Sequence, residues 1–254
     1  AFYESYLIED DQGLLQVIPS QSPENRFAGA EGLPVSIGIS SSMDVQLIMD
    51  TLSKGIEAAN ILDLDKDRIA IWKSILERLP RLEIGERGQL LEWNEDFKEI
   101  EPGHRHISHL YGLFPGDLIT PEKTPRLYEG AKTSLELRLK EGGGHTGWSR
   151  AWVACCFARL GESEKAWEHL QALIRDFATD SLLDLHPPAI FQIDGNLGGT
   201  AAILEMLFQS YHSELHFLPA LPKDWPKGSV RGLRGRGGYT IDIDWVDGKF
   251  KRAK

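Results

Sequence analysis

Two carboxylates in different sequence contexts are the leading candidates for acid–base chemistry. Glu24 lies in the stretch SPENRF, where Pro19 and Pro23 rule out regular helix and predict a loop. Asp194 lies in FQIDGNLGGTAAILEMLFQS, where a glycine-rich turn precedes an apolar run that predicts a helix. A loop glutamate is mostly solvated, and an aspartate at a helix start is a preferred N-cap. From the residues alone, a solvated loop side chain is therefore favoured for Glu24 and a structural N-cap for Asp194.

The Asp194 stretch carries further expectations about its helix. Its glycines are expected to relax the backbone before the helix starts, so that Asp194 or Asn196 can accept hydrogen bonds from the free N–H groups of the first turn. The residues that follow leave little polar surface, which predicts a helix packed on both sides and ending near Tyr211. The glycines are Gly195, Gly198 and Gly199.

A histidine cluster in HRHISHLYGLFPGD is the next candidate site. His104 and His106 would lie on the same face of an extended segment. Imidazoles are common zinc ligands, but no acidic or cysteine partner follows at a familiar spacing. Histidines that hydrogen-bond a polar ligand, or one another, are therefore favoured over a metal site.

Aromatic and acidic residues between the helices complete the set of candidates. His145 follows the glycine run of EGGGHTGWSRAW, and Trp148 opens the helix behind it. Trp93, Trp148 and Trp152 could stack on sugar rings, and packing at the start of a helix would explain Trp148 equally well. Glu92, with Glu95 and Asp96, gives the segment LEWNEDF an acidic character that would line a cleft or face water.

These residues must be held by a mainly α-helical chain. Apolar residues recur every three or four positions over about 43–62, 66–79, 121–140, 148–160 and 163–177. Polar loops fall between the helices and would gather at one end of a closed ring of helices. From about residue 214 the alternation of Tyr239, Ile241, Ile243 and Trp245 with polar residues predicts strands, and Asp247-Gly248 predicts a hairpin turn. The first ten residues are helix-like without a basic leader, so a chain cut from a longer protein is expected.

Charge and composition limit the classes of partner. The formal net charge of −10, without a Lys/Arg-rich run, argues against nucleic acid or an anionic membrane surface. No apolar run is long enough to span a membrane. Cys155 and Cys156 are adjacent in a predicted helix, so they are interpreted as small core residues rather than a disulfide, and the redox compartment stays undetermined.

Six stretches occurring together and in order resemble the α-L-fucosidases of glycoside hydrolase family 95. They are SPENRF, LLEW, HRHISHLYGLFPG, GHTGWSRAW, FQIDGNLGGTAAI and LPALPKDWPKGSVRGLRGRGGY, and they cover nearly the whole chain. The resemblance implies that residues 1–213 are the C-terminal two-thirds of an (α/α)6-barrel catalytic domain. Residues 214–254 would begin the C-terminal β-sheet domain of the family.

The resemblance also implies roles for the candidate residues. The family removes terminal α-L-fucosyl groups, typically linked α-1,2 to galactose, with inversion and without a cofactor. Glu24 resembles the general acid, Asp194 resembles the carboxylate that helps activate water, and His106 resembles a sugar-contacting histidine. His104, His145 and Trp148 are further substrate-binding candidates. The implied partner is a fucosylated oligosaccharide or glycan, and family members often act on extracellular or periplasmic glycans.

One departure from the family pattern concerns the attacking water. In the family this water is held chiefly by two asparagines in an Asn-x-Asn stretch, which would precede this chain; here Asn25, Asn60, Asn94 and Asn196 are isolated. A carboxamide cannot take up a proton unaided, so Asp194 would act through such an asparagine. The chain alone is therefore expected to hydrolyse little or nothing, and the N-terminal part of the same protein is its expected partner.

Other functions remain open on the sequence. An α-L-galactosidase is close, because its sugar differs from fucose only at C6. A glycoside phosphorylase of the (α/α)6 class would need a basic phosphate site, for which Arg105 and Arg150 are too few. A polysaccharide lyase of this class, or a non-catalytic carbohydrate-binding remnant, would also carry such aromatic residues.

Overall fold

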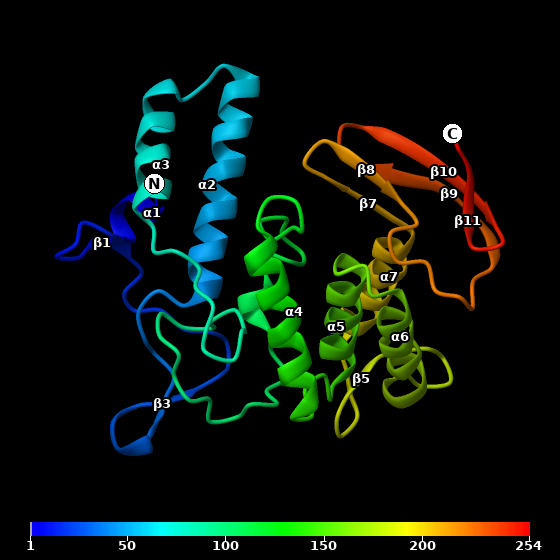
Figure 1. Cartoon of the computed structure of the whole chain (residues 1–254), viewed down its shortest axis with the longest axis horizontal. Coiled ribbons are helices and arrows are strands. Elements are labelled where there is room, and N and C mark those ends of the chain that lie inside the picture. The colour runs from blue at the N-terminus through cyan, green and yellow to red at the C-terminus, as the bar shows by residue number, and fades with distance from the viewer. Residues whose placement is uncertain (1) are drawn as a thin grey trace. The chain divides into compact units, whose positions relative to one another are not determined.

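The computed structural model describes residues 2–254. These residues form two compact units, the first ending at Gly143 and the second beginning at Gly144. The described residues are mainly helical, with seven α-helices, and their C-terminal end forms a small β unit (Figure 1). None of the helices in this part of the chain is long and apolar enough to cross a membrane. Each unit has its own buried core.

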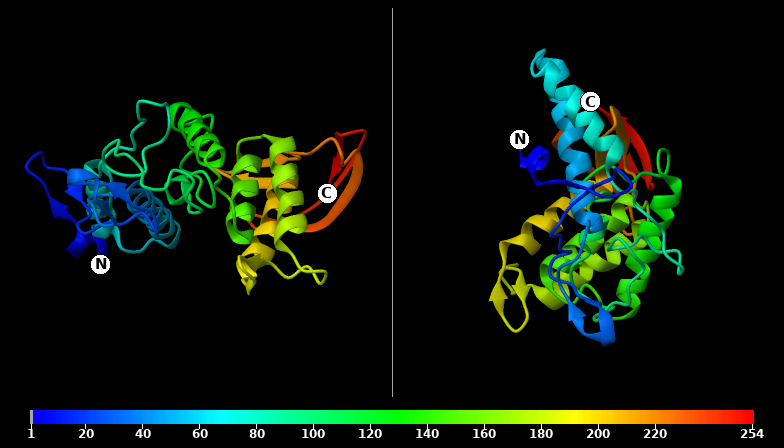
Figure 2. Two further views of the ribbon diagram at one scale, coloured as in Figure 1. Left: turned by 90° about the horizontal axis from the view of Figure 1, so that it is seen from below. Right: turned by 90° about the vertical axis from the view of Figure 1, so that its left-hand side faces the viewer.

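Two helices that pack side by side dominate the first unit (Figures 1 and 2). Helix α2 (Ser42–Leu62) begins at Ser41, whose hydroxyl accepts a hydrogen bond from the Asp44 amide. Helix α3 (Lys66–Arg78) ends before Pro80, as expected because a proline disfavours helical geometry in the residue before it. Both helices match the predicted ranges. Their shared core also takes in the chain before α2 and contains Leu15, Val17, Val45, Ile48, Leu52, Ile75 and Leu79.

Short elements and long loops make up the rest of this unit. The N-terminal part contains α1 (Phe2–Tyr6), the antiparallel pair β1 (Ile8–Glu9) and β2 (Leu15–Gln16), and the pair β3 (Phe27–Ala28) and β4 (Pro34–Val35). Two single 3-10 turns, η1 (Ala30–Gly32) and η2 (Ser108–Leu110), lie in loops. The loop between β2 and β3 carries Glu24.

Helix α4 (Pro125–Lys140) holds one of the long loops in place. It begins four residues after the predicted start at 121, because hydrogen bonds between Thr120 and Thr124 close a turn there. The Leu90 amide donates to the Gly130 carbonyl of α4 (3.1 Å), and the Ser134 hydroxyl donates to the Leu90 carbonyl (3.1 Å). The segment LLEW is thereby fastened to α4.

Three packed helices form the first part of the second unit: α5 (Gly147–Arg159), α6 (Ser163–Phe177) and α7 (Ile193–Leu207). Thr146 and Ser149 cap α5 reciprocally, each side chain bonding the backbone of the other. Cys155 and Cys156 are free thiols in the buried core, as predicted. The small hairpin of β5 (Leu185–His186) and β6 (Ile190–Phe191) comes just before α7.

Helix α7 differs from its prediction in three ways. It begins at Ile193, so Asp194 lies inside the first turn and neither it nor Asn196 is the cap; the N-cap is Gln192, without a side-chain bond. The three glycines lie within the helix, where they allow close packing: a Cβ at Gly198 would lie 2.9 Å from Ala151. The helix packs on one face only, while Leu197, Ile203 and Leu204 are exposed.

The β unit begins at Phe208, because α7 gives way there to a hairpin. Strand β7 (Phe208–Tyr211) pairs with β8 (Glu214–Phe217), so the predicted continuation of the helix to Tyr211 is wrong. Strands β9 (Lys227–Gly235), β10 (Tyr239–Val246) and β11 (Lys249–Ala253) form an antiparallel sheet in the order β11-β10-β9. The hairpin turn predicted at Asp247-Gly248 joins β10 to β11 and is confirmed.

Candidate functional site

Glu24 is an exposed carboxylate held by two neighbours from a distant part of the chain. Its side chain is 63% exposed, on the loop before β3. The Arg105 guanidinium forms an ion pair and hydrogen bond with Glu24 Oε2, and His106 Nε2 lies 3.7 Å from the same oxygen. The structure therefore joins two of the predicted stretches, SPENRF and HRHISH, around one accessible carboxylate.

The two predicted histidines of this region differ in accessibility. His104 is buried, and its Nδ1 accepts a hydrogen bond from the His106 amide (3.1 Å). The two rings lie 5.1 Å apart, in agreement with their predicted placement on one face. Burial, together with the neighbouring His104 and Arg105, lowers the pKa of His106 to about 4. His106 is thus neutral at neutral pH, so its approach to Glu24 is a polar contact and not an ion pair.

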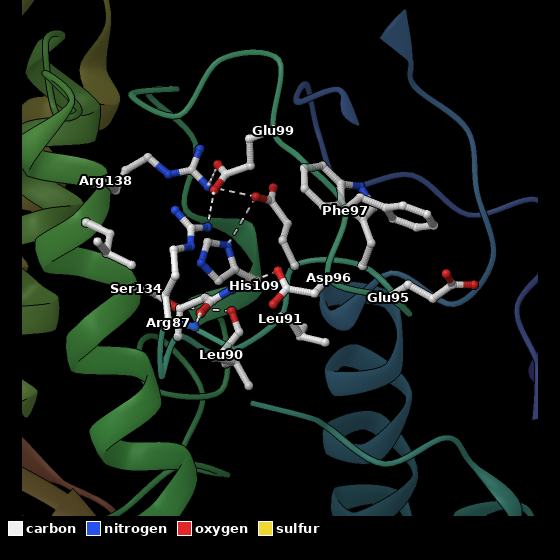
Figure 3. A pocket seen from close by; sticks show the side chains of 14 residues that line it. Arg87, Leu90, Leu91, Glu95, Asp96, Phe97, Glu99, His109, Ser134 and Arg138 are labelled. Carbon is white, nitrogen blue, oxygen red and sulfur yellow. Dashed lines mark hydrogen bonds and ion pairs between the residues drawn. The ribbon is translucent and has the colours of Figure 1, made fainter. Parts of the chain in front are cut away.

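Beneath this loop, Glu92 is the centre of a buried polar network. Its carboxylate accepts hydrogen bonds from Ser22 Oγ (2.7 Å), Asn25 Nδ2 (3.0 Å) and Arg138 Nη2 (2.7 Å). Arg138 also lies 3.1 Å from Glu99 Oε2, and His109 Nδ1 lies 3.8 Å from Glu92. Figure 3 shows Arg138, Glu99 and His109 close together around a small pocket.

Charge compensation decides the ionisation of this network. Burial raises the pKa of Glu92, but His109, Arg138 and the Ser22 hydrogen bond lower it more, so the net shift is downward. Burial also lowers the pKa of His109 to about 4, which leaves that imidazole neutral at neutral pH. Arg138 and the hydrogen-bond donors therefore keep Glu92 ionised near pH 7.

From the sequence, the segment with Glu92, Glu95 and Asp96 was expected to line a cleft or to face water. All three residues line the small pocket, but Glu92 does not face water, because only 4% of its side chain is exposed. Arg138 was not recognised at all, although it follows Leu135 by three residues and so falls on the buried face of α4. Trp93 is also buried and packs edge-on against Phe27, with ring centroids 5.3 Å apart, so it cannot stack on a sugar.

In the second unit, Asp194 lies exposed in the first turn of α7. A carboxylate there is favoured by the positive end of the helix dipole. Two residues later, Asn196 accepts a hydrogen bond from the Asp184 amide (2.9 Å) and donates one to the Leu182 carbonyl (2.6 Å). These bonds fasten the start of α7 to the loop before β5.

Asp184 is a buried carboxylate at the same helix start, and no sequence signal singled it out. Its side chain lies against Gly147 and Gly195, the first turns of α5 and α7, and a Cβ at either position would overlap it. The amides of Gly195 and Leu185 face it, but neither of its oxygens has a well-aligned hydrogen-bond partner. Burial raises the pKa of Asp184 more than those amides lower it, and the nearby Asp194 raises it further.

The remaining predicted residues, His145 and Trp148, lie at the start of α5. His145 is exposed in the turn before the helix, and Trp148 is half-buried with its ring centroid 6.4 Å from that of Trp152. The structure therefore brings Glu24, His104 and His106 together in the first unit, whereas Asp194, His145 and Trp148 belong to the second. Between residues 2 and 254, no group of three or more His, Cys, Asp or Glu side chains is placed to hold a metal ion.

Two family models match consecutive parts of the chain. The family model described as glycosyl hydrolase family 95 catalytic domain matches residues 1–207, and the one described as glycoside hydrolase family 95, C-terminal domain matches residues 209–254. Alpha-L-fucosidase 2 of Arabidopsis thaliana is 42% identical over 98% of this chain. Probable alpha-fucosidase A is 33% identical in Aspergillus oryzae and 31% identical in Aspergillus niger, over 92% and 97% of the chain. The chain spans about a third of the length of these relatives (31%, 34% and 33%).

Proposed function

The chain belongs to glycoside hydrolase family 95. From this premise we propose that it contributes the general acid of an inverting α-L-fucosidase, and that this acid is Glu24. The relatives that it matches are named as α-fucosidases, which supports a terminal α-L-fucosyl group as the substrate. The α-1,2 linkage is proposed from the family resemblance. We further propose that its helices belong to an (α/α)6 barrel, and that the β domain begins with the β7–β8 hairpin at Phe208 rather than at the expected residue 214.

The observation that carries the proposal is the setting of the Glu24 carboxylate. It is accessible, on a loop fixed from below by Glu92, and flanked by a cation and a neutral imidazole. A general acid must reach the leaving oxygen, which an exposed carboxylate on an anchored loop can do. His106 beside it can hydrogen-bond a sugar hydroxyl, while the buried His104 would act by orienting His106.

Arg105 also bears on the mechanism, because its guanidinium contacts Oε2 of the Glu24 carboxylate. A leaving-group oxygen that takes a proton from this oxygen must reach the same place, so bound substrate would displace Arg105 from it. The freed guanidinium would then be available to a sugar hydroxyl.

For the water side of the reaction we propose Asp194. Inverting enzymes place acid and base about 6.5–9.5 Å apart, with water between the base and the sugar. Asp194 is exposed at a helix start tied down through Asn196, which suits a group that must keep one orientation. His145, in the turn before α5, and Trp148, in the first turn of α5, are proposed to contact the substrate from the second unit.

Fucose release from 2′-fucosyllactose by the 254-residue chain tests the proposal, with Glu24→Gln and Asp194→Asn as variants. If the chain hydrolyses, either variant is expected to reduce kcat by about 100-fold or more, and proton NMR should show β-L-fucose as the first product. If it does not, calorimetry should still detect binding of L-fucose that weakens in His106→Ala. Full hydrolysis by Glu24→Gln, or neither hydrolysis nor binding in the parent chain, would contradict the proposal.

A further inference from the structure

Glu92 makes its hydrogen bonds to the two residues that bracket the proposed acid. Oε1 accepts from Ser22, and Oε2 accepts from Asn25, so the donors lie two residues before and one residue after Glu24. The Ser108 hydroxyl also donates to the carbonyl of Pro23 (3.1 Å). These bonds therefore hold residues 22, 23 and 25, and Glu24 between them has an exposed side chain.

Glu92 is itself held firmly enough to serve as an anchor. Its carbonyl accepts a hydrogen bond from the Ser42 amide (3.0 Å) at the start of α2, and its carboxylate is paired with Arg138 of α4. The preceding Leu90 is bonded to α4 by both its amide and its carbonyl. The Glu24 loop is thus connected to two long helices through one residue, by the backbone carbonyl of Glu92 to α2 and by its carboxylate to α4.

We propose that Glu92 is a positioning residue for the general acid: its carboxylate holds Ser22 and Asn25 so that Glu24 keeps the orientation needed to protonate the leaving oxygen. This inference rests on the proposed role of Glu24. A misplacement of about 1 Å at a reacting group can cost about 100-fold in rate, so an anchor of this kind has a large kinetic effect without touching substrate.

The chain offers a matched control in Glu99. Its carboxylate also pairs with Arg138, and additionally with Arg87 (3.2 Å), but in the described chain neither Ser22 nor Asn25 bonds to it. Glu92→Gln and Glu99→Gln each remove one carboxylate from the same arginine. Only the first changes the acceptor of the Glu24 loop, because an amide has one acceptor oxygen where the carboxylate has two.

Hydrogen–deuterium exchange with mass spectrometry tests the anchor in the 254-residue chain and needs no hydrolysis. In Glu92→Gln, peptides covering residues 20–27 are expected to exchange at least about tenfold faster than in the parent, and by a larger factor than peptides covering 125–140 of α4, which report the loss of overall stability. In Glu99→Gln both regions should stay within about twofold. Equal exchange of residues 20–27 in all three proteins, or equal acceleration by both variants, would overturn the proposal.

A second variant covers the case in which Glu92→Gln does not fold. Ser22→Ala combined with Asn25→Ala removes the loop side of the bonds and leaves the pair of Glu92 and Arg138 intact. It is expected to reproduce the faster exchange of residues 20–27. Unchanged exchange there would refute the role of these bonds.

Kinetics separate positioning from simple loss of stability. With 2′-fucosyllactose, Glu92→Gln is expected to lower kcat about 10- to 100-fold while KM changes less than about twofold, and Glu99→Gln should change neither by more than about twofold. The measured rates are divided by the folded fraction of each variant, so that unfolded protein is not counted as a lower kcat. If the parent chain neither hydrolyses nor binds fucose, the fucosidase proposal fails, and the exchange experiment still decides whether Glu92 anchors the loop.

Discussion

The two candidate catalytic carboxylates each lie beside a second, buried carboxylate, and the two buried groups are stabilised in opposite ways. Glu92, behind the Glu24 loop, has an arginine partner, two further hydrogen-bond donors and a lowered pKa. Asp184, at the helix start that carries Asp194, has no well-aligned donor and a raised pKa. A charge network thus compensates the burial of Glu92, whereas Asp184 has no such network and its pKa is raised by burial.

The two regions also hold their exposed carboxylates, Glu24 and Asp194, in different ways. The Glu24 loop has no regular secondary structure, so side-chain bonds to Glu92 must replace the missing backbone ladder. Asp194 is already fixed by helix α7, and the surroundings of Asp184 depend on glycine at two helix starts. The stability of the first region should therefore depend on its charged groups, and the stability of the second on the volume of the side chains around Asp184.

The largest effect is expected from Arg138→Leu, which leaves Glu92 buried without its cation. Breaking a buried ion pair from one side costs about 3–5 kcal/mol, and urea unfolding monitored by circular dichroism would measure the loss. Arg87→Leu is the control, since its exposed pair with Glu99 is worth about 0–1 kcal/mol. Similar losses in both variants would show that the network is not charge-compensated as described.

The same chemical change in the two buried acids should give different results. Glu92→Gln removes a charge that three donors stabilise, and we expect a loss of about 1.5–3 kcal/mol in the free energy of unfolding. Asp184→Asn removes a charge without a well-aligned partner, so a change within about 0.5 kcal/mol is expected at pH 7. A larger loss from Asp184→Asn than from Glu92→Gln would reverse the comparison.

Volume is tested by Gly147→Ala. An added Cβ would lie 1.6 Å from Asp184 Oδ1, so the site must open, and overpacking of this kind costs about 1–3 kcal/mol. Gly55→Ala in α2 is the control, because the nearest atom there is 3.7 Å away and alanine favours a helix by about 1 kcal/mol. Combining Gly147→Ala with Asp184→Ala should recover part of the loss; no recovery would mean that the clash lies elsewhere.

The smallest effect is the pH dependence of these two acids. The lowered pKa of Glu92 means that its stabilisation is present above its ordinary value of 4.5 and is lost as the pH falls through the folded-state value. For Asp184 the raised pKa has the opposite sign: stability declines as the pH rises from its ordinary value of 3.8 through the folded-state value. Urea unfolding at pH 4 and pH 7 should therefore show Glu92→Gln more damaging at pH 7, and Asp184→Asn more favourable there; the reverse order would contradict the assigned shifts.

Local features of the fold were predictable because they depend on neighbours in sequence. The spacing of Val45, Ile48 and Leu52 was enough to predict α2, and Asp247-Gly248 was enough to predict the last hairpin. The start of α7 was misplaced because glycines at 195, 198 and 199 suggest a turn, whereas contacts with α5 and α6 make them helical packing residues. Family membership followed from six ordered motifs and is confirmed by both family models.

Periodicity and motifs thus predicted most of the helical ranges, the presence of a β unit and the family, and they singled out Glu24 and Asp194, which the structure shows to be exposed. Which carboxylates are buried behind these two depends on contacts between distant segments. Glu92 bonds to Ser22 and Arg138 across separations of 70 and 46 residues, and Asp184 lies between the starts of two helices. Periodicity and composition report on a few neighbouring residues, whereas burial and charge compensation arise from contacts between distant segments, which is why these two acids could be recognised only in the folded chain.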